Sequence, residues 1–203
     1  MRFLYLASQS PRRRQLLEQI GVRHELLLPD AHEDTEALEK VLPEEAPDDY
    51  VLRVTLAKLA AARTRLLARG LPAAPILCAD TTVALGPRLF GKPADDEDAA
   101  LMLQALSGRT HRVLTAVALA EAPHVAFAPQ CVLQVSSVRF RELAPDEIVR
   151  YVASGESQGK AGAYAIQSQA AAWVEHIEGS YSGIMGLPLF ETAEMLKAVG
   201  WTF

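Results

Sequence analysis

The sequence predicts one α/β unit, in which helices flank a mixed β-sheet and the chain is arranged in two lobes. The first observation behind this prediction is that strand-like and helix-like patterns alternate along the chain. The second is a pair of long strand-like runs, 112–120 and 132–140, which are suited to pair as antiparallel neighbours. The third is size, because 203 residues that are 50% hydrophobic can form one sizeable core. We find no internal repeat or low-complexity segment, and therefore expect residues 1–203 to form a single domain.

The first half of the chain shows two short strand patterns and two helix patterns. Ser10 is a good helix N-cap, Pro11 suits the first helical position and Gly21 is a typical stop. An acidic loop broken by Pro43 and Pro47 precedes the longer helix. The expected elements are strands at 3–7 and 24–28, a helix from Pro11 to Gly21, the loop 30–49, and a helix at 48–69 that Gly70 ends.

The second half begins with a buried strand and continues with alternating patterns. The helix expected at 95–106 opens with four acidic residues, where the helix dipole favours negative charge. Gly86-Pro87 indicates a turn, and Gly108 ends the helix. The expected elements are strands at 75–85, 112–120, 132–140, 164–167 and 173–177, and helices at 95–106, 145–153 and 188–199.

Composition argues against several classes of protein. A net charge of −5 argues against a nucleic-acid or anionic-membrane surface, so we expect neither partner. Cys78 and Cys131 lie far apart in apolar runs, which does not indicate a disulfide framework and fits a reducing compartment. No signal-peptide pattern and no uncharged apolar run of about 18 residues is present. We therefore expect a cytoplasmic protein.

Three consecutive arginines, Arg12 to Arg14, fall in the first turn of the first expected helix. This end of a helix carries partial positive charge, so each exposed cation costs roughly 0.3–1 kcal/mol. The arrangement is favourable if an anion binds there, because free backbone N–H groups and guanidinium groups would then converge on it. The alternative is a solvated basic surface, and this stretch by itself leaves both open.

Asp80 follows a buried apolar run and begins a polar stretch with Thr81 and Thr82. Strand ends are where ligand sites form in open α/β sheets, and a carboxylate there can bind a divalent metal or take a proton from water. The alternative for Asp80 is a turn cap, and for the threonines a purely structural place in the strand.

Other candidates carry weaker signals. Lys58 shares a helix face with small apolar residues, so it either extends to the surface or points at something negative. Lys92 and Lys160 lie on glycine-flanked loops, where a lysine is usually just solvated. Glu33 lies in an acidic stretch, and spacing alone does not distinguish it from its neighbours. Gln167 follows an apolar run, and its amide can read a base edge or bind backbone.

Together these residues suggest a chemistry without reference to any family. Arg12, Arg13, Lys58, Lys92 and Lys160 could neutralise a polyphosphate. Asp80 and a second carboxylate could hold a magnesium ion and activate water for phosphoanhydride hydrolysis. The chain has no Walker-type glycine-rich lysine loop, so it is not expected to be a P-loop enzyme.

Five segments, in order and spread over nearly the whole chain, resemble the signatures of the Maf family. They are Leu6-Ala7-Ser8-Gln9-Ser10-Pro11-Arg12-Arg13, Ala79-Asp80-Thr81-Thr82-Val83, Gly91-Lys92-Pro93, Lys160-Ala161-Gly162-Ala163-Tyr164-Ala165-Ile166-Gln167, and Gly179-Ser180-Tyr181 followed by Gly186-Leu187-Pro188-Leu189. The resemblance implies a mixed α/β fold with a cleft between two lobes. It also implies a cytoplasmic nucleoside triphosphate pyrophosphatase that uses a divalent cation, Mg²⁺ or Mn²⁺, and commonly forms a homodimer.

The resemblance also implies roles for individual residues. Asp80 matches the general base, and Arg12, Thr81 and Gln167 match positions that set nucleotide preference. Five further matches are to positions needed for activity: Ser8, Arg13, Glu33, Lys58 and Lys92. We expect Asp80, Glu33, Lys58 and Lys92 to be catalytic, and Ser8, Arg12, Arg13, Thr81 and Gln167 to bind substrate. Glu33 and Asp80 are the expected metal ligands.

The Ala79-Asp80-Thr81 run and the run ending at Gln167 resemble the branch of the family that acts on dTTP and UTP. The expected reaction is hydrolysis to the nucleoside monophosphate and pyrophosphate, with modified pyrimidine nucleotides as further substrates. Two alternatives stay open at this point. One is a pyrophosphatase for 7-methylguanosine triphosphate or another nucleotide, and the other is a nucleotide-binding regulator of cell division.

Overall fold

The computed structural model describes residues 2–30, 32–34, 37–121 and 129–203, and its centre is a seven-stranded mixed sheet. The strands run in the order β2-β1-β3-β5-β6-β7, with β4 paired to β3 outside this path. Their bounds are β1 Leu4–Leu6, β2 His24–Leu26, β3 Ile76–Leu85, β4 Arg88–Phe90, β5 Thr110–Ala120, β6 Gln130–Phe140 and β7 Val174–Glu178. The predicted α/β class is therefore confirmed.

The sheet is mixed because its first strands are parallel and the rest antiparallel. β1 pairs in parallel with β2 on one side and β3 on the other. β3, β5, β6 and β7 then pair antiparallel, with the long β5–β6 pairing that the sequence predicts. β1 reaches β3 only at Ile76 and Leu77, and β4 pairs only from Val83 to Leu85. Within the described residues, the stretch of β3 between these two contacts has no strand partner on that side.

Six α-helices and three short 3₁₀ helices surround the sheet within the described residues. Their bounds are α1 Pro11–Gln19, α2 Pro47–Ala68, α3 Asp96–Leu106, α4 Pro145–Ala153, α5 Tyr181–Met185 and α6 Leu189–Ala198, with 3₁₀ helices η1 Ala37–Glu39, η2 Ala161–Ala163 and η3 Gln169–Trp173. The predicted starts at Ser10 and Asp95 are confirmed, since each is the N-cap of its helix. Asp95 accepts a bond from the Asp98 N–H, whereas the Ser10 side chain makes no capping bond.

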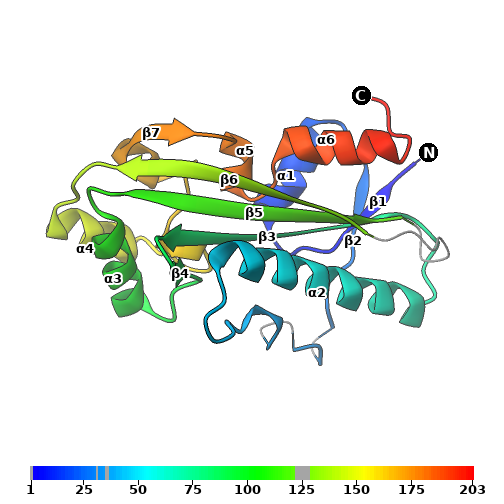
Figure 1. Cartoon of the computed structure of the whole chain (residues 1–203), viewed down its shortest axis with the longest axis horizontal. Helices are drawn as coiled ribbons and strands as arrows, with labels where there is room; N and C mark the ends of the chain where they lie inside the picture. The colour runs from blue at the N-terminus through cyan, green and yellow to red at the C-terminus, as the bar shows by residue number, and fades with distance from the viewer. Residues whose placement is uncertain (1, 31, 35–36, 122–128) are drawn as a thin grey trace.

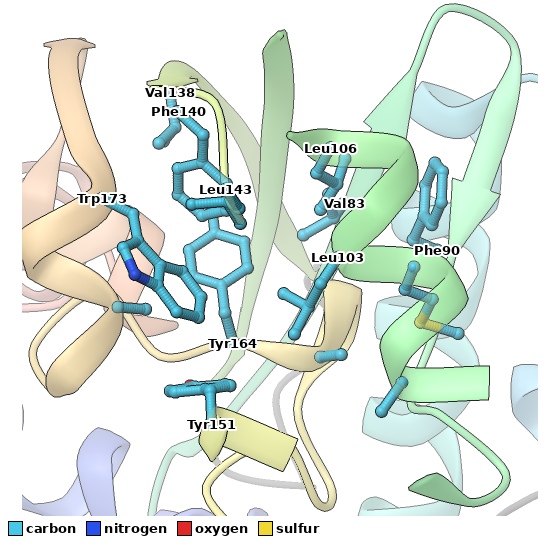
Figure 2. Packing of buried hydrophobic residues seen from close by; sticks show 14 of the residues in the cluster. Val83, Phe90, Leu103, Leu106, Val138, Phe140, Leu143, Tyr151, Tyr164 and Trp173 are labelled. Carbon is cyan, nitrogen blue, oxygen red and sulfur yellow. The ribbon is translucent and has the colours of Figure 1, made fainter. Parts of the chain in front are cut away.

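The helices divide the molecule into two lobes along the sheet (Figure 1). At the end that holds β1 and β2, α1 and α6 cover one face of the sheet and α2 the other. At the opposite end lie α3, α4 and β7. That second lobe has its own apolar cluster, in which the Phe140, Tyr164 and Trp173 rings gather near Leu103 and Leu106 of α3 (Figure 2). Each lobe therefore has its own apolar clusters, so a pocket can lie between the two lobes.

The structure differs from the sequence prediction in one element that matters for the site. Residues 164–167 do not form a strand; they follow η2 as irregular chain. The physical reason lies just before them, where Gly162 and Ala163 have φ values of 68° and 61°. This left-handed backbone is incompatible with an extended run, and it turns the segment toward β3. A Cβ on Gly162 would lie 2.9 Å from a Val83 methyl carbon, so the close approach needs glycine.

Smaller elements were not predicted. β4, α5 and the three 3₁₀ helices are each five residues or fewer, too short for a periodic pattern to indicate them. Among the described residues, no helix is long and apolar enough to cross a membrane.

Candidate active site

A pocket of about 500 Å³ opens where β3 lacks a strand partner between β1 and β4. Segments from both lobes line it. They are Ala7–Arg13, Leu38 and Glu39, Tyr50, Lys58, Ala61 and Arg65 of α2, Ala79–Val83 of β3, Gly91 and Lys92, Gly159–Ala161, Tyr164–Gln167 and Ile184–Gly186. The pocket therefore brings together eight of the nine predicted site residues, all except Glu33.

Alternation along β3 sends neighbouring functional side chains to opposite faces of the sheet. Ile76 and Cys78 belong to the cluster beneath α2, whereas Leu77 and Ala79 belong to the cluster beneath α1 and α6. Side chains two residues apart share a face. Asp80 therefore faces α2 and Thr81 the opposite layer. Asp80 lies within β3, in register with Ala116 of β5, and not at a strand end as the sequence suggested.

On the α2 face, two carboxylates and two lysines form one ionic chain. The Lys58 ammonium donates to Asp80 Oδ1 at 2.5 Å and to Glu39 Oε1 at 2.7 Å. Lys92 donates to the same Glu39 carboxylate at 2.9 and 3.1 Å. Three of these residues were predicted site residues; Glu39 was not.

The surroundings keep both Lys58 and Glu39 charged. Burial disfavours the ammonium of Lys58, but Asp80 and Glu39 outweigh burial and raise the Lys58 pKa. Burial likewise disfavours the Glu39 carboxylate, but Lys58 and Lys92 outweigh it and lower the Glu39 pKa. Asp80 is 8% exposed, so its carboxylate lies in a largely water-excluded place with one direct cationic partner, Lys58.

On the opposite face, Arg13 ties together three segments that are distant in sequence. Its Nε donates to the Gly186 carbonyl at 2.7 Å, Nη1 to Ser8 Oγ at 3.2 Å and Nη2 to Thr81 Oγ1 at 3.1 Å. Thr81 Oγ1 also lies 3.0 Å from Thr115 Oγ1. Burial lowers the Arg13 pKa, and the nearby Asp80 charge offsets part of that effect. A half-buried guanidinium whose direct partners are neutral groups is well suited to attract an anion.

The other two arginines of the triplet have different surroundings. Arg12 lines the pocket and donates from Nε to the Met185 carbonyl at 3.2 Å. Burial and the neighbouring Arg13 both lower the Arg12 pKa, which indicates a cation short of negative partners. Arg14 lies outside the pocket, half-exposed, at 3.8 Å from Glu18 of the same helix. Two of the three arginines therefore line the pocket, and Arg14 fits the alternative of a solvated surface.

Glu33 is the one predicted site residue that the structure places outside the pocket lining. Its carboxylate accepts from Arg65 Nε at 2.8 Å and from Arg65 Nη2 at 2.5 Å. These hydrogen bonds with Arg65 lower the Glu33 pKa to about 2. Arg65 also donates to the Leu27 carbonyl, and it is Arg65 that lines the pocket. Glu33 thus contacts the site through a buried arginine.

The segment Tyr164–Gln167 forms the pocket wall in the second lobe. The Tyr164 hydroxyl lies 2.8 Å from His111 Nε2, and both side chains are buried. Gln167 is exposed, and its amide can donate and accept hydrogen bonds at once. Lys160, at the start of this segment, has a pKa lowered by burial and by Arg12.

The carboxylates of the pocket could bind a divalent cation whose remaining ligands come from the substrate. Asp80 and Glu39 carboxylates already converge on one cation, the Lys58 ammonium. Among the described residues, no group of three or more histidine, cysteine, aspartate and glutamate side chains is placed to hold a metal. Mg²⁺ is commonly bound by one or two carboxylates, with water and substrate phosphates completing its shell. The residues present suit that mode and not an all-protein cage.

Sequence reasoning missed Glu39, Arg65 and Tyr50, all of which line the pocket. Glu39 lies among several acidic residues of one loop, and no spacing distinguishes it. Arg65 could have been found, because it lies seven residues after Lys58 and so shares its helix face.

The chain is similar to known proteins over nearly its whole length. The family described as Maf-like protein matches residues 3–199. A dTTP/UTP pyrophosphatase of Albidiferax ferrireducens is 62% identical over 199 residues, covering 98% of both chains. One from Ralstonia nicotianae is 63% identical over 199 residues, covering 98% of this chain and 95% of the relative. A solved HAM1 protein from Coxiella burnetii has the same fold, with a TM-score of 0.51 at 18% identity over 98% of this chain and all of that one.

Proposed function

Because the chain belongs to the Maf family, we propose that it hydrolyses dTTP and UTP to the nucleoside monophosphate and pyrophosphate. The observation that carries this proposal is the near-full-length identity of 62% to a dTTP/UTP pyrophosphatase. The pocket supports it independently, because cations and an aspartate from both lobes converge there. The enzyme is a nucleoside triphosphate pyrophosphatase, acting on a phosphoric anhydride bond.

Asp80 has the position of a general base. Its carboxylate accepts a hydrogen bond from the Lys58 ammonium in a largely buried place, and its other oxygen can take a proton from a water molecule. The water oxygen forms the new P–O bond, and pyrophosphate leaves as the α–β anhydride bond breaks. Asp80 would help to hold a divalent cation, which would supply positive charge against the phosphates.

The cations of the pocket bind the triphosphate. Arg12, Lys92 and Lys160 line the pocket from both lobes. Arg13 uses one N–H of each nitrogen on the protein, which leaves further N–H donors of the guanidinium for phosphate oxygens. Preorganised charge of this kind stabilises the negative charge that develops during phosphoryl transfer.

Base preference is proposed to depend on Gln167, with Thr81 and Arg12 acting nearby. Uracil and thymine present an N3–H donor beside carbonyl acceptors, and the Gln167 amide can pair with such an edge. The Thr81 hydroxyl is already engaged by Arg13 and Thr115, so its influence operates through the position of Arg13. A site that hydrogen-bonds a base edge can reject the wrong base strongly.

The proposal is tested with a panel of nucleoside and deoxynucleoside triphosphates in Mg²⁺. We expect dTTP and UTP to be the best substrates, with monophosphate and pyrophosphate as products by ion-exchange chromatography. Asp80→Asn should lower kcat by at least about 100-fold, as expected for a lost general base. Release of orthophosphate, or a higher kcat/KM for 7-methylguanosine triphosphate, would contradict the proposal.

The division-regulator alternative is addressed by the same Asp80→Asn variant. If overexpression of this inactive variant reproduced any division phenotype of the wild type, regulation would be independent of hydrolysis. Dependence on Mg²⁺ or Mn²⁺, a homodimer and cytoplasmic localisation are further proposals that rest on the family.

A further inference from the structure

The pocket contains a carboxylate that neither the sequence nor the family resemblance assigns, Glu39 of η1. We infer that Glu39, together with Asp80, binds the divalent cation of the reaction, the role expected of Glu33 from the family resemblance. This inference rests on the proposed function, because it concerns the cation that accompanies the triphosphate.

The first argument is geometric. A single ammonium, that of Lys58, lies 2.5 Å from Asp80 Oδ1 and 2.7 Å from Glu39 Oε1. The two carboxylates come from different elements and still reach one common cationic centre. Each has a second oxygen for a further partner, which for Glu39 is Lys92 at 2.9 Å. Two oxygen donors aimed at one point form the protein half of a magnesium site.

The second argument concerns charge. Asp80 and Glu39 carry two negative charges, and Lys58 and Lys92 carry two positive ones, so the four side chains together are neutral. Nothing in this group favours an incoming triphosphate by net charge, and both carboxylates repel it. A divalent cation between the carboxylates and the phosphates removes that repulsion and lets the lysines pair with phosphate oxygens.

The third argument is that α2 holds the backbone around Glu39 in place. The Tyr50 hydroxyl donates to the Glu39 carbonyl at 3.0 Å. Arg53 donates to the carbonyls of Leu38 at 3.4 Å and Lys40 at 2.9 Å. The helix that carries Lys58 therefore also positions Glu39. Tyr50 and Arg53 are positioning residues, because their contacts are with the loop and not with the cation.

Glu33 does not meet these conditions. Both of its oxygens accept from Arg65, and one also accepts from the Asp30 N–H at 3.1 Å. It does not line the pocket. To bind the cation, Glu33 would have to leave a buried arginine without its partner, which is costly.

The experiment measures binding of Mn²⁺ directly, by the loss of its free-ion electron paramagnetic resonance signal. Titrations are made with and without a dTTP analogue whose α,β-bridging oxygen is replaced by NH. We expect Glu39→Gln to weaken Mn²⁺ binding at least about tenfold in the presence of the analogue. Glu44→Gln, the same change at an exposed position of the same loop, is the matched control and should bind Mn²⁺ as the wild type does.

Two further variants distinguish a ligand from a structural effect. Tyr50→Phe removes the hydroxyl bond to the Glu39 carbonyl without a change in charge, and should weaken Mn²⁺ binding less than Glu39→Gln. Glu39→Asp keeps the charge and should recover part of the lost affinity. Wild-type Mn²⁺ affinity in Glu39→Gln, or an equal or larger loss in Glu33→Gln, would overturn the inference.

Failure of the inference and failure of the proposed function give different results. If the wild type does not hydrolyse dTTP or UTP, the proposed function fails whatever Mn²⁺ does. If hydrolysis occurs and Glu39→Gln binds Mn²⁺ normally, only the inference fails.

Discussion

At the residue scale, the Arg12–Arg14 triplet shows how one sequence pattern divides into three roles. Arg13 is half-buried and donates hydrogen bonds to Ser8, Thr81 and the Gly186 carbonyl. Arg12 lines the pocket, and Arg14 pairs loosely with Glu18 near solvent. A helical turn of 100° per residue sends consecutive side chains in different directions, so the three cannot share one environment.

We predict that Arg13→Ala lowers kcat/KM for dTTP by at least about 100-fold, because it removes a positioned cation and frees Thr81. It should also lower the melting temperature, since hydrogen bonds to a charged group contribute about 1.5–3 kcal/mol each.

Arg12→Ala should reduce activity and alter the ratio of dTTP to UTP turnover. Arg14→Ala, the matched control, should change kcat/KM less than about twofold, as expected for an exposed pair. Steady-state kinetics on the three variants checks this; equal losses would mean that the triplet acts as a diffuse positive patch.

At the element scale, the segment after η2 is held by contacts with the long strands β5 and β6. His111 of β5 lies 2.8 Å from the Tyr164 hydroxyl, and the Phe140 ring packs edge-on against both. Burial lowers the His111 pKa to about 4, so the imidazole is neutral in the folded protein at pH 7. This neutral, buried pair fixes the wall that carries Gln167.

The consequence is a pH dependence of stability with a defined sign. The folded-state pKa of His111 lies below its unfolded value of 6.5, so its contribution is complete above pH 6.5 and is lost as pH falls toward 4. The loss is on the order of 3 kcal/mol. Thermal unfolding between pH 7 and 4 should therefore show a shallower decline for His111→Asn than for the wild type.

The control for this prediction is His176→Asn, at an exposed position of β7, which should keep the wild-type decline. His111→Asn should also be less stable than the wild type at pH 7, because it leaves Tyr164 without its partner. Identical pH profiles for wild type and His111→Asn would show that the imidazole takes up no proton on unfolding.

At the scale of the whole molecule, the pocket exists because the sheet is incomplete on one side of β3. β1 pairs with β3 only as far as Leu77, and β4 pairs with it only from Val83 onward, which leaves Asp80 and Thr81 between them. Residues from both lobes then line the gap. A ligand in this position contacts both lobes at once, and so should oppose their separation.

We therefore predict that nucleotide and metal together stabilise the fold. At a ligand concentration of 100 times Kd, the gain is about 2.7 kcal/mol, or roughly 5–10 °C in melting temperature for a chain of this size. Differential scanning fluorimetry with the NH-bridged dTTP analogue and Mg²⁺ measures it. The corresponding dATP analogue is the control and should give a smaller shift. An unchanged melting temperature at a saturating concentration of the dTTP analogue would contradict the proposal that the pocket binds nucleotide.

The sequence predicted most of the long elements correctly, because their signals are local. Ser10-Pro11 predicted the start of α1, Gly70 the end of α2, and the polar residues around Asp95 the start of α3. The strand predicted at 164–167 was wrong. Left-handed backbone at Gly162 and Ala163, and packing of Gly162 on Val83, overrode the strand-like composition of this segment. Glu33 was predicted from the family resemblance, and the structure places Glu39 and not Glu33 beside Lys58.

By itself, the sequence determined the α/β class, since hydrophobic periodicity and helix caps depend on near neighbours, and its ordered motifs determined the family. Only the tertiary structure decided which carboxylate shares the Lys58 ammonium with Asp80, which arginine donates to Thr81 and which face of β3 each side chain takes. The physical reason is that the interaction between two charged side chains depends on their distance in space, and not on their separation in the sequence. Glu39 and Asp80 are 41 residues apart in the chain but share one ammonium, and no local pattern encodes that meeting.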